Sequence, residues 1–168
     1  LSRIERGQNL SIEAKSVNLM EMLHRIFRSY VNLFPRYRFD ITMAENIAEV
    51  FEIDQKRMTQ ALENILNNAI RYSKPGSFIR LNVTGTEDGL KLSVRDEGIG
   101  MTEDEVERIF EPFVHGSRAP DHAGTGLGLA IARSVAEAQG GSVSYRGRRG
   151  GGSVFELRLP RGHLEPLE

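Results

Sequence analysis

Residues 96–100 have the sequence Asp-Glu-Gly-Ile-Gly and follow an alternating apolar stretch, residues 90–95, that predicts a β-strand. Gly98 and Gly100 allow the backbone to take positive φ angles and to approach a ligand closely. Asp96, at the end of the strand, can accept a hydrogen bond from an exocyclic amine. Taken alone, the same five residues also suit a turn that merely ends a strand. A binding site at this turn therefore requires support from other parts of the sequence.

A second glycine-rich motif, Gly-Thr-Gly-Leu-Gly-Leu at residues 124–129, runs directly into a predicted helix that ends near Gln139. Such a loop presents backbone N–H groups and the positive end of the helix dipole to a phosphate. It differs from a P-loop, which ends in Gly-Lys-Ser/Thr, and from a dinucleotide fingerprint, which follows a strand at βαβ spacing. On its own, the motif is equally expected of a flexible joint at a helix start.

The third motif is an amphipathic helix predicted at residues 54–72, with Asp54 as its N-cap. Its polar face carries three asparagines, Asn64, Asn67 and Asn68. A plain solvent-facing surface would favour Lys and Glu, because asparagine is a poor helix former. Asn64 and Asn68 are i, i+4 neighbours that can point toward one ligand, and amide oxygens suit Mg²⁺. We expect this face to bind a ligand. The alternative is a solvent-exposed helix whose asparagines have no binding role.

The rest of the chain predicts one α+β domain around these motifs. Strands are expected at residues 10–14, 37–43, 49–53, 78–86, 90–95, 142–146 and 153–159. Helices are expected at residues 17–34, 54–72, 102–110 and 126–139. Strands joined by hairpins, with helices grouped between them, predict a two-layer sandwich. We expect a mixed, mostly antiparallel sheet with helices on one face.

The composition excludes several classes of protein. The 168 residues carry 22 basic and 23 acidic side chains, and this balance argues against a general nucleic-acid binder. The absence of cysteine excludes disulfides, thiol catalysis and cysteine-ligated zinc. No apolar run approaches the roughly 20 residues that a membrane span needs, so we expect no membrane contact by this fragment. Because the chain opens on Leu1, we expect a piece of a longer protein.

Together with Phe-Glu-Pro-Phe at residues 110–113, the three motifs resemble, in order and spacing, the catalytic ATP-binding domains of sensor histidine kinases. These domains have the Bergerat-type fold shared with DNA gyrase, the ninety-kilodalton heat-shock chaperone and MutL. The resemblance covers residues 10–160 and implies ATP and Mg²⁺ as cofactors. It implies an ATP lid at about residues 101–123, the end of a dimerisation helix and a linker at residues 1–9, and a tail at residues 161–168.

The resemblance also implies roles for residues of the asparagine motif. Asn68 takes the place of the Mg²⁺ ligand, and Asn64 lies beside it. Arg71 matches the basic residue near the phosphates, and Tyr72 matches the residue that packs near the adenine. Asn64, Asn68 and Arg71 are therefore the expected catalytic residues.

The two glycine motifs receive the nucleotide in the same comparison. Asp96 takes the place of the aspartate that binds the adenine amine, supported by Gly98 and Gly100. The residues expected beside the phosphates are Gly124, Thr125, Gly126, Leu127 and Gly128.

One position separates the branches of the superfamily. Gyrase-like ATPases carry a glutamate that activates water four residues before the metal asparagine, and that position is Asn64 here. Glu63 is adjacent but projects about 100° away on a helix. The resemblance therefore favours phosphoryl transfer to a protein over hydrolysis.

The chain departs from the family pattern at its histidines. None of His24, His115, His122 and His163 lies in the acceptor box, so we expect only the donor half of the reaction. Val114 and His115 stand where the family often has Tyr-Arg, which leaves open whether His115 or Arg118 contacts phosphate.

The implied partners are a histidine-bearing dimerisation domain of the same parent protein and a response regulator downstream. We expect a cytoplasmic domain that is monomeric in isolation, within a homodimeric parent whose membrane anchoring the sequence leaves open. Two alternatives also stay open. One is a serine kinase of the anti-sigma-factor type, which shares the pocket, and the other is a degenerate scaffold that binds nucleotide weakly or not at all. The sequence names neither the signal nor the cognate response regulator.

Overall fold

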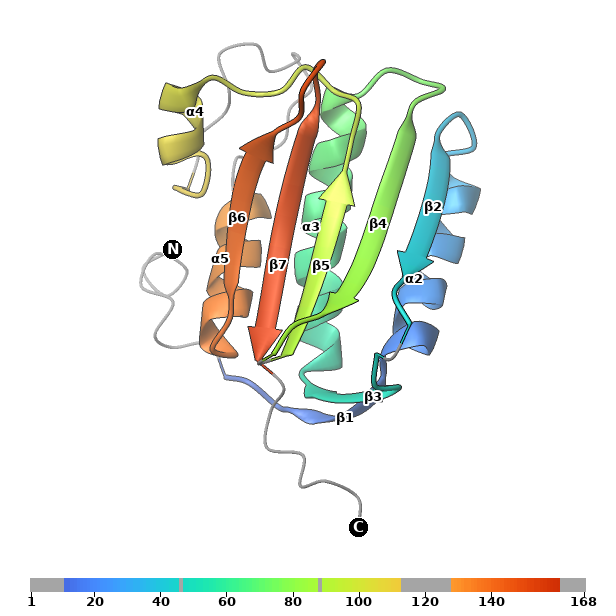
Figure 1. Cartoon of the computed structure of the whole chain (residues 1–168), viewed down its shortest axis with the longest axis vertical. Coiled ribbons are helices and arrows are strands. Elements are labelled where there is room, and N and C mark those ends of the chain that lie inside the picture. The colour runs from blue at the N-terminus through green and yellow to red at the C-terminus, as the bar shows by residue number, and fades with distance from the viewer. Residues whose placement is uncertain (1–10, 46, 88, 113–127, 161–168) are drawn as a thin grey trace.

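The computed structural model describes residues 11–45, 47–87, 89–112 and 128–160 (Figure 1). The helices are α2 (Leu19–Leu33), α3 (Gln55–Tyr72), α4 (Glu103–Arg108) and α5 (Gly128–Ala138). The strands are β1 (Lys15–Asn18), β2 (Arg38–Met43), β3 (Val50–Ile53), β4 (Phe78–Gly85), β5 (Gly89–Arg95), β6 (Ser142–Gly147) and β7 (Ser153–Pro160).

The domain has two layers. Figure 1 shows a five-stranded sheet with α2, α3 and α5 packed behind it. The strand order is β2-β4-β5-β7-β6, in which only β2 and β4 pair in parallel, while β1 and β3 form a separate antiparallel pair. The expected α+β sandwich with a mixed, mostly antiparallel sheet is therefore confirmed.

Alternation along the strands gives the sheet one apolar and one polar face. In β4, Ile79, Leu81 and Val83 are fully buried, whereas Arg80 is exposed. Successive side chains of a strand point to opposite faces, so the three apolar residues pack beneath the helices and Arg80 faces away from them. The core consequently lies between the sheet and the helical layer.

Helix α3 supplies the centre of the helical layer. Its apolar residues recur every three or four positions, which brings them to one face of the helix. All of these residues are buried: Met58, Ala61, Leu62, Ile65, Leu66, Ala69 and Ile70. The apolar face expected from the sequence is confirmed, and the opposite face of α3 is left for polar contacts.

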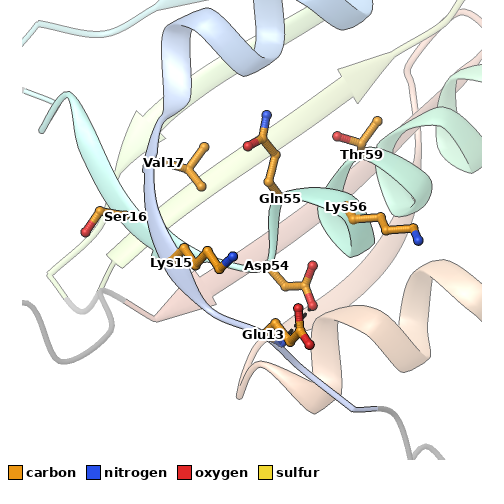
Figure 2. A pocket seen from close by; sticks show the side chains of 8 residues that line it. All are labelled: Glu13, Lys15, Ser16, Val17, Asp54, Gln55, Lys56 and Thr59. Atoms are coloured by element: carbon orange, nitrogen blue, oxygen red, sulfur yellow. Dashed lines mark hydrogen bonds between the residues drawn. The ribbon is translucent and has the colours of Figure 1, made fainter.

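Asp54 connects three segments at the beginning of α3. One carboxylate oxygen accepts a hydrogen bond from the backbone N–H of Arg57 (3.0 Å), which caps the helix as predicted. The other accepts from the backbone N–H of Glu13 (2.9 Å), a contact drawn in Figure 2. The backbone N–H of Asp54 donates to the side chain of Gln139 (3.0 Å), just after α5. This buried residue, 6% exposed, therefore links the chain before β1, through its carboxylate, and the end of α5, through its backbone N–H, to the start of α3.

Three predicted boundaries are wrong. The first strand covers Lys15–Asn18 rather than residues 10–14, because Val17 is buried in the pairing with β3 while residues 11–14 contribute no buried side chain. Helix α2 starts two residues later than expected because Asn18 caps it by accepting from Glu21 N–H (3.0 Å). Helix α4 ends at Arg108, two residues early. The helix end expected within residues 1–9 lies outside the described residues.

Replacing Asp54 with alanine is expected to lower the free energy of unfolding by about 1–2 kcal/mol or more, because the cap and the bond to Glu13 are lost together. Asn18→Ala removes a cap with one exposed bond and should cost less, about 0.5–1 kcal/mol. Urea denaturation followed by circular dichroism measures both. Equal losses would show that the contact with Glu13 contributes nothing.

Candidate nucleotide-binding site

Asp96 is a buried carboxylate directly after β5, with 2% of its surface exposed. Its Oδ1 accepts hydrogen bonds from the backbone N–H groups of Gly98 (2.9 Å) and Ser153 (3.1 Å). The backbone N–H of Asp96 donates to the carbonyl of Ser153 (3.0 Å). No donor among the described residues bonds to Oδ2. The carboxylate is thus oriented through one oxygen, and the other is left as an acceptor.

The surroundings of Asp96 work in opposite directions on its ionisation. Burial raises the pKa of Asp96 from 3.8 to about 6, while the N–H groups of Gly98 and Ser153 and the charge of Arg148 oppose this rise. Because the folded-state pKa is raised, this group stabilises the fold most below pH 4, and that contribution is lost as the pH rises through 6. At neutral pH the ionised carboxylate is retained at a cost in stability, as is typical of functional sites.

The end of α3 lies against the loop that follows Asp96. The backbone N–H of Ile99 donates to the carbonyl of Tyr72 (3.3 Å). A Cβ atom on Gly98 would lie 2.6 Å from the same carbonyl oxygen, so only glycine allows this approach. The structure therefore brings together Tyr72 and Asp96, the two residues expected at the adenine.

The turn between β6 and β7 also contributes to the Asp96 site, and the sequence analysis missed this. Arg148 donates from Nη1 to the carbonyl of Asp96 (2.8 Å). Gly152 has a φ of +99°, and a Cβ atom there would overlap the same carbonyl oxygen. From the sequence, residues 147–152 predicted only a turn. The run of glycines was the available signal, but only the pairing of β5 with β7 places it at Asp96.

Asn64 lies between α3 and α5. Its side chain contacts Gly128, where a Cβ atom would lie 3.5 Å from Asn64 Oδ1. Its Nδ2 is buried without a hydrogen-bond partner in the part of the chain that the structure describes. A buried polar group without a partner is uncommon in proteins and indicates a site for water or ligand. Asn68, one turn further along α3, is half-buried, and Arg71 is exposed.

Asn67 does not belong to this group, although the sequence placed it on the same polar face. Its Oδ1 accepts a hydrogen bond from the hydroxyl of Tyr30 (2.7 Å), which also donates to the carbonyl of Glu63 (3.2 Å). Burial raises the pKa of Tyr30, so the hydroxyl keeps its proton. The face with three asparagines therefore splits into a structural contact with α2, made by Asn67, and a candidate site formed by the other two.

The donor set fits a magnesium ion that arrives with a nucleotide. Within the described ranges, no group of three or more His, Cys, Asp or Glu side chains could hold a metal. Asn64 and Asn68 offer amide oxygens, which are hard and neutral ligands. Mg²⁺ usually keeps several waters and shares its ligation with phosphates, so two amides suit a nucleotide-borne ion better than a permanent metal.

Several predicted site residues lie outside the described residues: Gly124, Thr125, Gly126, Leu127, Phe113, Val114, His115 and Arg118. Of the second glycine motif, Gly128 is described and opens α5. Gly100 has a φ of +71°, as expected for the loop after Asp96. Phe110 is half-buried and packs against the core.

A cavity of about 480 Å³ lies elsewhere, at the beginning of α3 (Figure 2). Figure 2 shows that its wall comes from the β1 segment and the first turns of α3. It is lined by Glu13, Lys15, Ser16, Val17, Asp54, Gln55, Lys56 and Thr59. None of the predicted site residues is among them, so this cavity is separate from the Asp96 site.

Comparison with known proteins gives the family. Residues 53–163 match the family described as histidine kinase-, DNA gyrase B- and HSP90-like ATPase. The chain belongs to this ATPase family. An ATP-binding role follows from the family, and the expected resemblance is confirmed.

Relatives of the ATPase domain are sensor histidine kinases. The chain is 36% identical over 136 residues to sensor histidine kinase WalK of Bacillus subtilis (strain 168), covering 73% of this chain and 22% of WalK. The catalytic domain of histidine kinase ThkA is 26% identical with a TM-score of 0.78, covering 89% of this chain and 96% of that one. Full-length ShkA in complex with AMPPNP is 25% identical with a TM-score of 0.77, and the match covers 91% of this chain and 32% of ShkA. The chain spans about a fifth of the length of the curated relatives it matches.

The ATPase domain has no helix, within its described residues, that is both long and apolar enough to cross a bilayer. In sequence and in fold, the chain is similar to the catalytic ATP-binding domains of histidine kinases.

Adenosine affinity is expected to fall by about tenfold between pH 7 and pH 5, because the resemblance assigns the adenine amine to ionised Asp96 and the pKa of Asp96 lies near 6. Adenosine is the ligand of choice since it carries no titrating phosphate. Titration by NMR at constant ionic strength measures the affinity. Asp96→Asn should bind weakly without dependence on pH over this range, and a flat profile for the unmodified chain would contradict the assignment.

Proposed function

We propose that this domain binds Mg-ATP between α3 and the Asp96 loop and donates the γ-phosphate to a histidine on a separate dimerisation domain. The observation that carries the proposal is the buried Asp96 carboxylate, fixed through Oδ1 and open at Oδ2 beside the end of α3. An exocyclic amine is the donor that such an acceptor suits. Family membership and sensor-kinase relatives support the same assignment.

The adenine end is recognised by hydrogen bonding and by exclusion of water. Asp96 Oδ2 accepts the amine, and the loop carrying Gly98 closes one side through its contact with Tyr72. Arg148 and Gly152 contact the backbone carbonyl of Asp96, whereas the N–H groups of Gly98 and Ser153 hold Oδ1, so the carboxylate stays in place when a ligand arrives. A site built to pair with one amine discriminates against bases that lack it, because an unpaired buried carboxylate is costly.

The phosphate end is supplied by α3 and by the start of α5. Asn68 would hold Mg²⁺ with Asn64 beside it, and Arg71 and the motif that ends in Gly128 would face the phosphates. When bound, Mg²⁺ neutralises charge that develops on the phosphate oxygens. The unpartnered Nδ2 of Asn64 supports a ligand at this position. These residues bind and orient the nucleotide.

Phosphoryl transfer is favoured over hydrolysis because, among the residues that the structure describes, Asn64 and not a carboxylate takes the position of a base. Asn64 faces α5, where a Cβ atom added to Gly128 would lie 3.5 Å from Asn64 Oδ1. Glu63 is exposed, and its negative charge contributes to the raised pKa of the Tyr30 hydroxyl, so its side chain lies on the side of α3 that faces α2. The attacking group must then come from outside this domain.

The proposal extends to the parent protein. Residues 10–160 form its catalytic domain, with the lid at about residues 101–123, and residues 1–9 continue from the dimerisation helix. The parent is a homodimer that passes phosphate to a response regulator. The fragment lies in the cytoplasm and is monomeric in isolation. Relatives that are sensor histidine kinases support a kinase as the parent protein.

Incubated with Mg-ATP, the chain is expected to phosphorylate a supplied histidine-bearing dimerisation domain and to show negligible labelling of itself. The acceptor is taken from the parent gene, and the label should be acid-labile and lost in an acceptor that carries glutamine in place of the histidine. Acid-stable phosphoserine on a partner would replace the proposal with a serine kinase. Absence of nucleotide binding at millimolar ATP in calorimetry would replace it with a scaffold.

Two adjacent asparagines offer a matched test of the metal site. Asn68→Ala should weaken Mg-ATP binding by about tenfold or more, equivalent to ~1.4 kcal/mol, while adenosine binding is unchanged. Asn67→Ala should leave both affinities within about twofold but lower the free energy of unfolding by about 1 kcal/mol, since Tyr30 loses its acceptor. Calorimetry and urea denaturation separate the two effects. Equal losses of Mg-ATP affinity in both variants would contradict the assignment of Asn68.

A further inference from the structure

The face of the five-stranded sheet that points away from the helices is open among the described elements. Figure 1 shows β2, β4, β5, β7 and β6 in front, with α2, α3 and α5 on the other side. We call it the open sheet face, formed by the outward side chains of these strands. It is distinct from the nucleotide site, whose residues lie on α3, on the loop after β5, on the turn between β6 and β7 and at the start of α5.

The open sheet face is strongly basic. Its basic side chains are Arg38, Arg80, Lys91, Arg95, Arg146 and Arg158. Its acidic side chains are Asp40 and Glu156. The whole chain has a net charge of −1, so this excess of positive charge belongs to one face and is balanced elsewhere. Such a separation of charge steers association with an oppositely charged partner.

Like charges stand directly opposite each other in two of the strand pairs. Arg80 of β4 is paired with Arg95 of β5, and Lys91 of β5 is paired with Arg158 of β7. Directly opposed like charges destabilise a sheet, because their side chains lie within about 5.5 Å at Cβ. In addition, Arg95 Nε is buried without a hydrogen-bond partner within the described part of the chain. This arrangement does not serve the stability of the isolated domain.

An aromatic ring orders part of the open sheet face. The guanidinium carbon of Arg80 lies 4.4 Å from the centroid of the Phe78 ring, and that of Arg38 lies 5.2 Å from it. Cation–π contact restrains both side chains. A restrained guanidinium loses less conformational freedom when it pairs with a carboxylate, which its planar fork binds through two hydrogen bonds.

We propose that the open sheet face docks an acidic segment of a partner protein, whose carboxylates insert between the opposed pairs Arg80–Arg95 and Lys91–Arg158. A carboxylate between two like charges relieves their repulsion. This inference does not depend on the proposed kinase activity.

The chemistry of the face favours a protein over a nucleic acid or a membrane. Glu156 lies within 3.4 Å of Arg146 and 3.6 Å of Arg158, so part of the positive charge is already neutralised. Asp40 adds a second carboxylate that a dense array of phosphates would meet with repulsion. The Phe78 ring carries guanidinium groups, which occupy the surface that a base would need for stacking. Interleaved charges of both signs are typical of protein interfaces, in which arginine is enriched.

The test uses the full 168-residue chain and a fluorescein-labelled peptide of alternating Glu-Glu-Leu and Asp-Glu-Leu triplets. Fluorescence anisotropy at low salt measures its affinity for three forms of the chain. Lys91→Gln combined with Arg158→Gln removes one opposed pair and should weaken binding by about tenfold. Arg25→Gln combined with Arg28→Gln makes the same charge change on the exposed side of α2 and should stay within about twofold of the original.

Thermal unfolding of the same variants excludes a merely structural effect. The Lys91 and Arg158 variant should melt no lower than the original chain, because repulsion is relieved, only a partly exposed ion pair is lost, and Glu156 keeps its ion pair with Arg146. Weaker peptide binding together with a lower midpoint would overturn the proposal. Equal weakening in the α2 variant, or tighter binding to phosphatidylserine vesicles or a single-stranded oligonucleotide than to the peptide, would overturn it as well.

Discussion

The carboxylate of Asp96 is the constraint on which the site depends. Its position requires the end of β5, the loop carrying Gly98 and the turn before Ser153 to meet at one point, and each contributes a backbone hydrogen bond or a close contact. Neither glycine at this junction tolerates a side chain, since Gly152 and Gly98 each touch a carbonyl oxygen. The glycines are therefore needed for the close backbone contacts at this junction, and these contacts position the Asp96 carboxylate as an acceptor.

Helix α3 contributes both to the core and to the candidate site. Its apolar face packs in the core, and different parts of its polar face lie against α2 and α5. Asn67 is committed to the hydroxyl of Tyr30 on α2, whereas Asn64 lies toward α5 with a donor left unpaired. Packing of two different helices against one polar stripe thus separates residues that stabilise the fold from residues left for a ligand. The same division keeps Glu63 away from the position where a base would act.

Local patterns predicted most of the fold, and long-range contacts account for what they missed. The apolar period of residues 54–72 and the cap at Asp54 predicted the bounds of α3 to within one residue. The turn residues of two hairpins predicted four strands of the main sheet. The first strand was misplaced because its pairing with β3 depends on a distant segment. Asp96 was predicted at the site from its own motif, but Arg148 was not, because no local pattern reveals that β7 lies beside β5.

The 18 residues of α3 span roughly 27 Å at ~1.5 Å per residue. At one end of this rod, Asp54 holds the segment that enters the domain at Glu13. At the other end, the carbonyl of Tyr72 holds the loop after Asp96. A hydrogen-bonded helix transmits displacement along its axis instead of absorbing it. The segment at Glu13 and the loop after Asp96 are therefore joined by one stiff helix, so a tilt of the entering segment would also move the opposite end of the domain.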